Sequence, residues 1–245
     1  MPEKFTIAKA DATYTDYSKQ VEKVKLQAKL DEALNTVIRK RALGKIAYKD
    51  LYKLQGIDKE RPYHEAYNTS DTLYIKPDDS RGSLAYSKQH TDTIAVSPGR
   101  VKNYSQGNLA DIIRHEVTHK EVNPLLNKAS ANLGYYTREF LPQDSMNVFG
   151  QNEVPVRTFK YYGSAQEMHA HTAGVLNTLY RQNQLPTDYQ DFKKKVAMLK
   201  RGDGEYTQVD GYRKIIEMTS GAKGGSLLDK MLESYYNYSR AKYKD

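Results

Sequence analysis

The sequence predicts an α+β protein that is mostly α, with a small antiparallel sheet before a helix at about residues 107–121 and with helices on both sides. Three observations predict this class. Apolar residues recur at three- and four-residue steps in several long segments. Two short runs between residues 82 and 98 have strand-like composition and flank a polar turn. Residues 115–119 read His-Glu-Val-Thr-His, a spacing typical of a helix that binds metal.

Composition limits the classes of protein. The chain has 245 residues, 38% of them hydrophobic, and a net charge of +8. It has no cysteine, so a metal would be held by histidine and carboxylate. The basic residues are spread along the chain and form no block with interleaved aromatics, so we do not expect nucleic acid as a partner. No stretch approaches 18 apolar residues, and we expect no membrane span.

The N-terminal third is predicted to be helical. Residues 1–14 resemble a loose arm, and a helix is expected from Asp16 to Ala42. Its core positions are predicted from residues at helical spacing, which are Val21, Val24, Leu26, Leu30, Leu34, Val37 and Ile38. A second short helix is expected at Ala47–Leu54. We assign residues 1–60 to an N-terminal helical arm.

A core is expected at residues 61–185. Residues 57–81 are polar and are predicted to be loop, with one strand at Leu73–Ile75. Two strands joined by a turn then lead to a helix at about 107–121. Asn108 is expected to cap this helix, with Asp111 at its positive end. Its burial is predicted from four apolar residues, which are Leu109, Ile112, Ile113 and Val117. The alternative is a surface helix whose histidines are incidental.

The remainder is expected to be helical after an irregular stretch at 124–160, which contains Gly134, Pro142, Gly150 and Pro155. Helices are predicted near residues 165–182, 187–201, 208–219 and 226–242. We assign residues 186–245 to a C-terminal helical extension.

The His-Glu-x-x-His spacing has a direct chemical meaning. His115 and His119 are four residues apart, so both imidazoles share one face of a helix and can ligate one zinc ion. Glu116 lies about a quarter of a turn away. Its carboxylate can reach a metal-bound water without being a ligand, so we predict that Glu116 is the general base.

A catalytic zinc needs a third protein ligand. Four of the six histidines fall in two short segments, and the second segment contains Glu167, His169 and His171. Glu167 and His171 share a helical face, whereas His169 points about 200° away from Glu167. Glu167 is favoured, although Ser164-x-x-Glu167 is also a capping box and Glu167 could serve only the helix end. His171 and His169 remain alternatives.

This part of the chain resembles the zincin metallopeptidases, in particular small gluzincin-like ones of phages and mobile elements. The resemblance covers residues 82–180, and it rests on the hairpin Gly82–Tyr86 and Thr93–Pro98, on the histidine motif, and on Ser164-x-x-Glu167-x-x-Ala170. It implies a zincin-like core, Zn²⁺ as cofactor, Glu167 as third ligand, and an extended substrate added along Thr93–Val96. Lys120 and Glu121 depart from the family, in which uncharged or apolar residues usually follow the second histidine.

We therefore expect a zinc-dependent peptidase acting on a peptide or protein, with His115, His119 and Glu167 as metal ligands. Candidate donors to the oxyanion are Tyr161, Tyr162 and His169. The alternative is a phage virion structural or cargo protein that retains a zincin domain with a mainly structural or inactive metal site, and whose partners are virion proteins. The first 20 residues have no apolar run, so we expect a cytoplasmic or virion-associated protein not secreted by a signal peptide.

Overall fold

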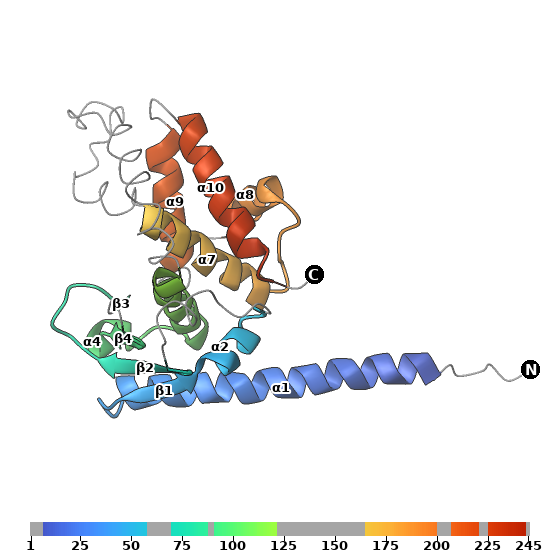
Figure 1. The fold of residues 1–245 in the computed structure, drawn as a ribbon, viewed down its shortest axis with the longest axis vertical. Helices are drawn as coiled ribbons and strands as arrows, with labels where there is room; N and C mark the ends of the chain where they lie inside the picture. The colour runs from blue at the N-terminus through green and yellow to red at the C-terminus, as the bar shows by residue number, and fades with distance from the viewer. Residues whose placement is uncertain are drawn as a thin grey trace, which may run out of the picture.

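The computed structural model describes residues 7–57, 70–87, 91–121, 165–199, 207–220 and 225–243. These ranges form layers, with the long helix α1 (Ile7–Ile38) on one side of a small sheet and further helices on the other side (Figure 1). Residues 106–121, here called the histidine helix, lie between the sheet and the C-terminal helices. The prediction of a mostly helical α+β protein is confirmed.

The sheet has four strands in the order β1-β2-β4-β3. They are β1 (Gly44–Ala47), β2 (Thr72–Pro77), β3 (Ala85–Ser87) and β4 (Thr93–Val96). The predicted strand at residues 73–75 is confirmed, because it lies within β2. The predicted hairpin is also confirmed, because β3 and β4 pair antiparallel. The prediction of a wholly antiparallel sheet is wrong. β4 returns between β3 and β2, so it runs parallel to β2.

The strand β1 was not predicted. It pairs antiparallel with β2 and packs on α1. Gly44 makes this possible, since a Cβ atom there would overlap the backbone carbonyl of Ala33 in α1. The short helix α2 (Tyr48–Leu54) follows directly, as predicted, and α4 (Pro98–Val101) follows β4.

The helix α1 differs from its prediction in two ways. It begins at Ile7, so most of the predicted loose arm is helical. Val24 also does not share the core-facing side, because its side chain is 69% exposed while Leu26 is buried. Residues two apart differ by about 200° around a helix, which places Val24 and Leu26 on opposite sides.

The histidine helix is buried on nearly all sides, which excludes the surface-helix alternative. Its first turn differs from the prediction. Ser105 is the capping residue, since its Oγ accepts a hydrogen bond of 3.2 Å from the backbone N–H of Asn108. Asn108 is itself buried. Asp111 binds side chains of α7 (Ala165–Arg181) rather than the helix end, accepting hydrogen bonds from Asn177 at 2.6 Å and Thr178 at 2.9 Å.

The C-terminal helices lie near their predicted places. After α7 come α8 (Tyr189–Met198), α9 (Thr207–Ser220) and α10 (Gly225–Arg240). In the described residues, α7 packs against both α9 and α10. The predicted irregular stretch 124–160 lies outside the described residues.

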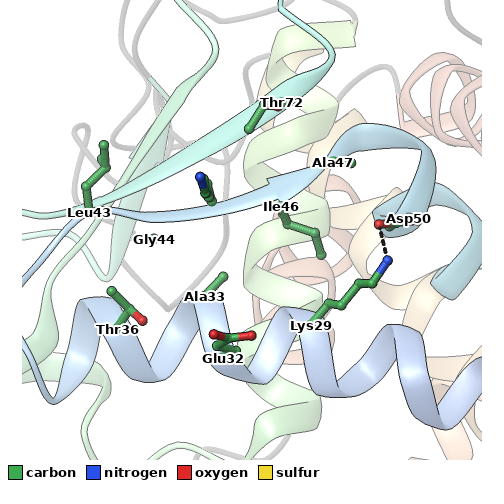
Figure 2. A pocket seen from close by; sticks show the side chains of 11 residues that line it. Lys29, Glu32, Ala33, Thr36, Leu43, Gly44, Ile46, Ala47, Asp50 and Thr72 are labelled. Atoms are coloured by element: carbon green, nitrogen blue, oxygen red, sulfur yellow. Dashed lines mark hydrogen bonds and ion pairs between the residues drawn. The ribbon is translucent and has the colours of Figure 1, made fainter.

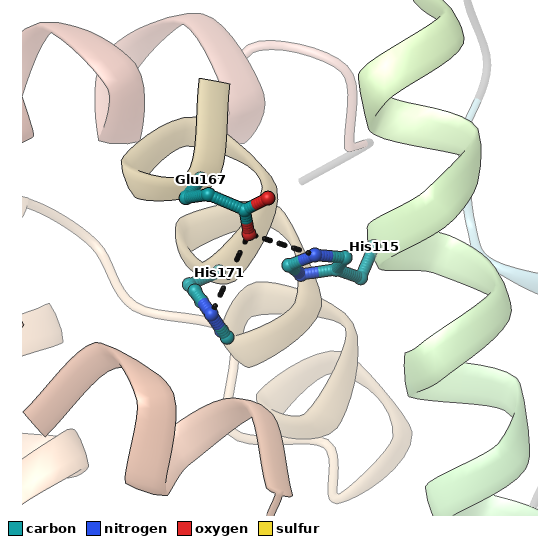
Figure 3. Close-up of side chains that lie close together, drawn as sticks. All are labelled: His115, Glu167 and His171. Carbon is teal, nitrogen blue, oxygen red and sulfur yellow. Dashed lines mark ion pairs between the residues drawn. The ribbon is translucent and has the colours of Figure 1, made fainter. Parts of the chain in front are cut away.

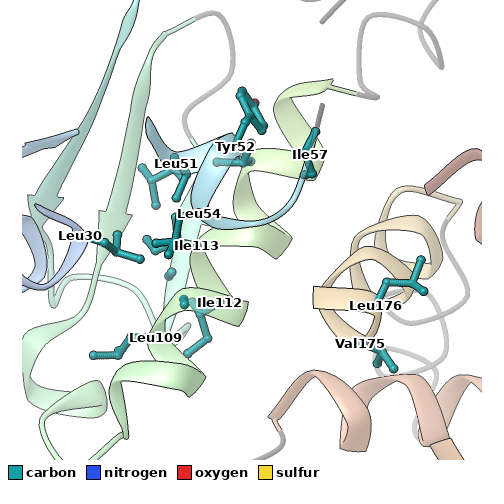
Figure 4. Packing of buried hydrophobic residues seen from close by; sticks show 14 of the residues in the cluster. Leu30, Leu51, Tyr52, Leu54, Ile57, Leu109, Ile112, Ile113, Val175 and Leu176 are labelled. Carbon is teal, nitrogen blue, oxygen red and sulfur yellow. The ribbon is translucent and has the colours of Figure 1, made fainter. Parts of the chain in front are cut away.

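One hydrophobic core joins all three predicted segments. Figure 4 shows Leu30 of α1 and Leu51 of α2 beside Ile113 of the histidine helix, with Val175 of α7 further along. The N-terminal arm, the core and the C-terminal extension therefore share buried apolar contacts. This packing holds the histidine helix between the sheet and α7.

Candidate metal centre

Two histidines meet on one face of the histidine helix. His115 and His119 are one helical turn apart, and their Nε2 atoms lie 3.1 Å from each other. The ring planes are nearly perpendicular, at 83°. Both side chains are shielded, with side-chain exposures of 5% and 11%. The spacing in sequence therefore places two imidazole nitrogens at one point.

The helix α7 brings Glu167 to the same point. One carboxylate oxygen, Oε2, lies 3.3 Å from His115 Nε2, and the other, Oε1, lies 3.4 Å from His119 Nε2. Figure 3 shows Glu167 and His115 facing each other from two helices. Ligands about 2.0–2.1 Å from a tetrahedral zinc ion are about 3.3–3.4 Å from one another. The two nitrogens and the carboxylate are therefore spaced about as zinc ligands are, with each nitrogen nearest a different oxygen of Glu167.

His171 lies beside this group on α7. Its Nε2 atom is 3.9 Å from Glu167 Oε2, and its ring centre is 4.5 Å from that of His115. Ligand atoms of His115, Glu167 and His171 all fall within 4.8 Å of one another, so this set could also hold a metal ion. The set with His119 has shorter separations, close to the edge of a zinc tetrahedron, and for that reason we favour it.

His169 points away from the centre. Its Nε2 atom is 3.0 Å from the hydroxyl of Ser239 in α10, and its ring stacks on Tyr235 with centres 5.1 Å apart. These contacts occupy the side chain, so we do not place His169 among the ligands or the oxyanion donors. The other predicted donors, Tyr161 and Tyr162, and the capping partner Ser164 lie outside the described residues.

The ionisation of the group suits metal binding. Burial alone would raise the pKa of Glu167, but its hydrogen bond to His115 and the charges of the surrounding histidines lower it to about 2. Burial and the charge of His115 lower the pKa of His119 to about 4. Burial also lowers the pKa of His171. An ionised carboxylate and neutral imidazoles are the forms that bind zinc.

His115 behaves differently in the protein without metal. Burial opposes its protonation, but its hydrogen bond to Glu167 and the nearby carboxylates outweigh burial and raise its pKa. A proton on His115 then supplies the positive charge that Glu167 faces. Binding of a metal ion would displace that proton.

Glu116 is adjacent to the ligands but makes a different set of contacts. The side chain is buried, with 7% of the residue exposed, and burial raises its pKa to about 7. Its carboxylate accepts a hydrogen bond from the backbone N–H of Ser87 in β3. A carboxyl group with a pKa near neutrality can both take up and return a proton.

The helix α9 forms one wall of the candidate metal centre, and this contact was not predicted from the sequence. The buried side chain of Gln208 lies beside His115 and His171. Gly211 leaves space for the His171 ring, because a Cβ atom there would overlap the imidazole. A glycine inside a helix often marks a close approach of another part of the chain. Gly211 was therefore the residue from which the contact of α9 with the histidines could have been predicted.

A buried ionic network supports the C-terminal end of the histidine helix. Arg114 binds Glu121 through two hydrogen bonds of 2.8 and 3.0 Å, and both side chains are almost fully buried. Tyr52 of α2 and Lys242 also donate to Glu121, at 3.0 and 2.7 Å. Glu121 therefore has a structural role, which is to join three parts of the chain.

The strand expected to receive a substrate is not available for that purpose. β4 pairs with β2 along Thr93–Val96 and with β3 along Ile94–Val96, so both of its edges are occupied. The prediction for Thr93–Val96 is wrong, because β4 inserts between its neighbours. β3 is the edge strand on this side of the sheet, and it contacts Glu116 through Ser87.

A cavity of about 430 Å³ lies apart from the histidines, between α1, β1 and α2 (Figure 2). Its lining includes an ion pair of 2.7 Å between Lys29 and Asp50. None of the histidines or Glu167 lines it. It therefore plays no part in the candidate metal centre.

Comparison of the chain with protein-family models, curated proteins and solved structures gives no match. Across the described ranges, every helix is too short or too polar to cross a membrane. The candidate metal centre is therefore the feature that bears on function.

Proposed function

We propose that this chain is a zinc-dependent peptidase. The observation that carries the proposal is a set of three separations. The Nε2 atoms of His115 and His119 lie 3.1 Å apart, and they lie 3.3 and 3.4 Å from Oε2 and Oε1 of Glu167, respectively. These match the edges of a tetrahedral zinc site with three protein ligands. Such a ligand set leaves a fourth position for water, as catalytic zinc sites do.

Zinc bound there would supply a Lewis acid and lower the pKa of a water molecule to about 7. Proton transfer and its positioning are then carried out by residues of the chain. Glu116 takes a proton from the attacking water and returns it to the leaving amine. The hydrogen bond from Ser87 N–H keeps its carboxylate in place. Glu116 is thus the catalytic residue, and the ligands do not share its role.

The edge strand β3 is the candidate seat for an extended peptide. A peptide can join a sheet through main-chain hydrogen bonds where an edge is unpaired. In the described sheet, β3 is an edge strand and its Ser87 lies against Glu116. A peptide paired with β3 would bring its backbone close to the proton acceptor. This supports cleavage of a peptide or protein chain.

One observation favours a second function. His171 is close enough to His115 and Glu167 to act as a further ligand. A zinc ion with four protein ligands is closed to water and stabilises a fold rather than catalysing a reaction. The second candidate is therefore a protein without peptidase activity in which a structural zinc ion stabilises the fold.

X-ray absorption of the zinc-loaded protein separates the two functions by counting ligands. Two histidine nitrogens in the first shell, with a light atom from water, support the peptidase. Three histidine nitrogens and no water support the structural site. Hydrolysis of a denatured protein substrate by wild type, and its loss in Glu116→Gln with zinc retained, would support catalysis directly.

A further inference from the structure

The helix α1 carries two apolar stripes on different sides. One stripe faces the core and includes the buried residues Leu26, Leu30 and Leu34. The other includes Val21, Val24 and Ala28, of which Val24 is 69% exposed and Ala28 is also exposed. The second stripe therefore has no partner among the described residues that could bury Val24.

The spacing of the second stripe continues toward the N-terminus. Apolar and tyrosine positions follow one another at alternating steps of three and four residues, in the order Ile7, Ala10, Tyr14, Tyr17, Val21, Val24 and Ala28. This is the repeat of a and d positions in a coiled coil. It covers about 22 residues, or about 33 Å of helix.

The body of the protein contacts the opposite side of α1. Glu22 forms an ion pair of 2.6 Å with Lys53 of α2, and Lys23 lies 5.4 Å from the ring centre of Tyr180 in α7. With Leu26, these residues occupy heptad positions b, c and f, which face away from a and d. Figure 1 shows the N-terminal part of α1 extending beyond the other helices. The described part of the second stripe, Val21, Val24 and Ala28, thus faces outward.

We propose that this stripe is a dimerisation surface on which a second copy of the chain docks its own α1 in the antiparallel direction. In an antiparallel pair, e positions of the two helices face each other. Here they are Asp11, Ser18 and Lys25. Asp11 of each copy then faces Lys25 of the other copy, and the two Ser18 residues face each other. Both copies use the same surface in this twofold pairing, so the assembly is a closed dimer.

A parallel pair would lack this charge match. Its flanking contacts join g of one helix to e of the other. The g positions are Thr13, Gln20 and Gln27, none of which is charged. The antiparallel arrangement also places the d position at residue 17 level with the a position at residue 21 of the other copy. The proposal is independent of the zinc centre.

The first test measures the mass of the full chain in solution at micromolar concentration by light scattering. Wild type should have twice the mass of one chain. Val24→Glu should be a folded monomer by circular dichroism and light scattering. Lys19→Glu is the matched control, because it puts the same residue on an exposed part of α1 outside the stripe, and it should remain dimeric. A monomeric wild type, or a dimeric Val24→Glu, would overturn the proposal.

The second test reverses the charges. Asp11→Lys or Lys25→Asp alone sets like charges together twice per dimer, so each should raise the dimer Kd, roughly threefold to tenfold. The double variant Asp11→Lys/Lys25→Asp restores opposite pairs and should return the Kd to that of wild type. Additive weakening in the double variant would overturn the antiparallel pairing.

Discussion

The Nε2 atoms of His115 and His119 lie 3.1 Å apart, one turn from each other on a helix that is buried on nearly all sides. The pair is thus assembled by the fold before any ligand arrives. We expect the protein to bind about one zinc ion per chain. His115→Ala should weaken zinc binding by more than about 100-fold, beyond the usual cost of losing a supporting residue.

Its matched control is His169→Ala, since that ring contacts Ser239 and Tyr235 instead of the metal group. It should retain zinc, as measured by metal analysis after dialysis. Wild type that takes up no zinc, or equal zinc loss in both variants, would contradict the ligand assignment. We expect bound zinc to stabilise the fold, so the Tm of His115→Ala should not rise when zinc is added.

Glu116→Gln should separate proton transfer from metal binding. The amide keeps the shape of the side chain but cannot accept the proton, so hydrolysis should fall by roughly 10²–10⁴-fold. Zinc content should stay at the level of wild type. Glu233→Gln, an exposed carboxylate on α10, should leave both zinc content and hydrolysis unchanged. Undiminished hydrolysis in Glu116→Gln would remove Glu116 from the mechanism.

The relative roles of Glu167 and His171 can be measured by zinc titration. Glu167 contacts both His115 and His119, so Glu167→Ala should weaken zinc binding as strongly as His115→Ala. His171 is farther from the carboxylate, at 3.9 Å, so His171→Ala should cost about 10–100-fold in zinc affinity, as a supporting residue does. Equal losses would make His171 a direct ligand and favour the structural site.

Gly211→Ala tests the wall formed by α9. A Cβ atom at this position would overlap the His171 imidazole, so the ring must move. We expect a loss of zinc affinity similar to that of His171→Ala, together with a lower Tm. Gly82→Ala is the control, because a Cβ atom there meets nothing nearer than the Arg100 guanidinium at 4.0 Å. Unchanged zinc affinity in Gly211→Ala would mean that the position of His171 does not matter to the metal.

The turn after β2 should make stability depend on acid pH. Hydrogen bonds from Ser97, Arg41 and the Gly99 backbone lower the pKa of Asp79 to about 2. A lowered pKa stabilises the folded state above the ordinary pKa of about 4, and this contribution is lost as pH falls toward about 2. Asp79→Asn should therefore lower the Tm at neutral pH, and the difference from wild type should shrink below pH 4.

Thermal melts between neutral and acid pH measure this difference. Asp71→Asn removes an exposed carboxylate from the same sheet region and should change the Tm little. A Tm difference between Asp79→Asn and wild type that stays constant across the acid range would contradict the assignment.

The parts that the sequence predicted well depend on local spacing. The histidine pair, the hairpin and the C-terminal helices follow from repeats of two or of 3.6 residues. Contacts between distant segments leave no such repeat in the sequence, and they were therefore not predicted. β1 has four residues and no clear alternation, and its position depends on the fit of Gly44 against α1. Likewise, Gln208 and Gly211 reach the histidines only after α9 packs on α7.

Two errors have the same origin. Val24 fits the helical repeat that leads to Leu26, but repeats of three and four residues can describe either side of a long helix. The order of strands in the sheet is also not visible in local patterns, so β4 was given an open edge that belongs to β3. Both features are set by which surfaces meet in three dimensions.

The network around Glu121 has a consequence for the order of events during synthesis. Arg114 and Glu121 leave the ribosome long before Lys242, whose amino group lies 2.7 Å from Glu121. At bacterial or eukaryotic rates of translation, the interval is on the order of ten seconds. Glu167 emerges within that interval. For part of that interval the nascent chain carries the two histidines without their carboxylate partner, so the candidate metal centre stays incomplete until Glu167 has emerged.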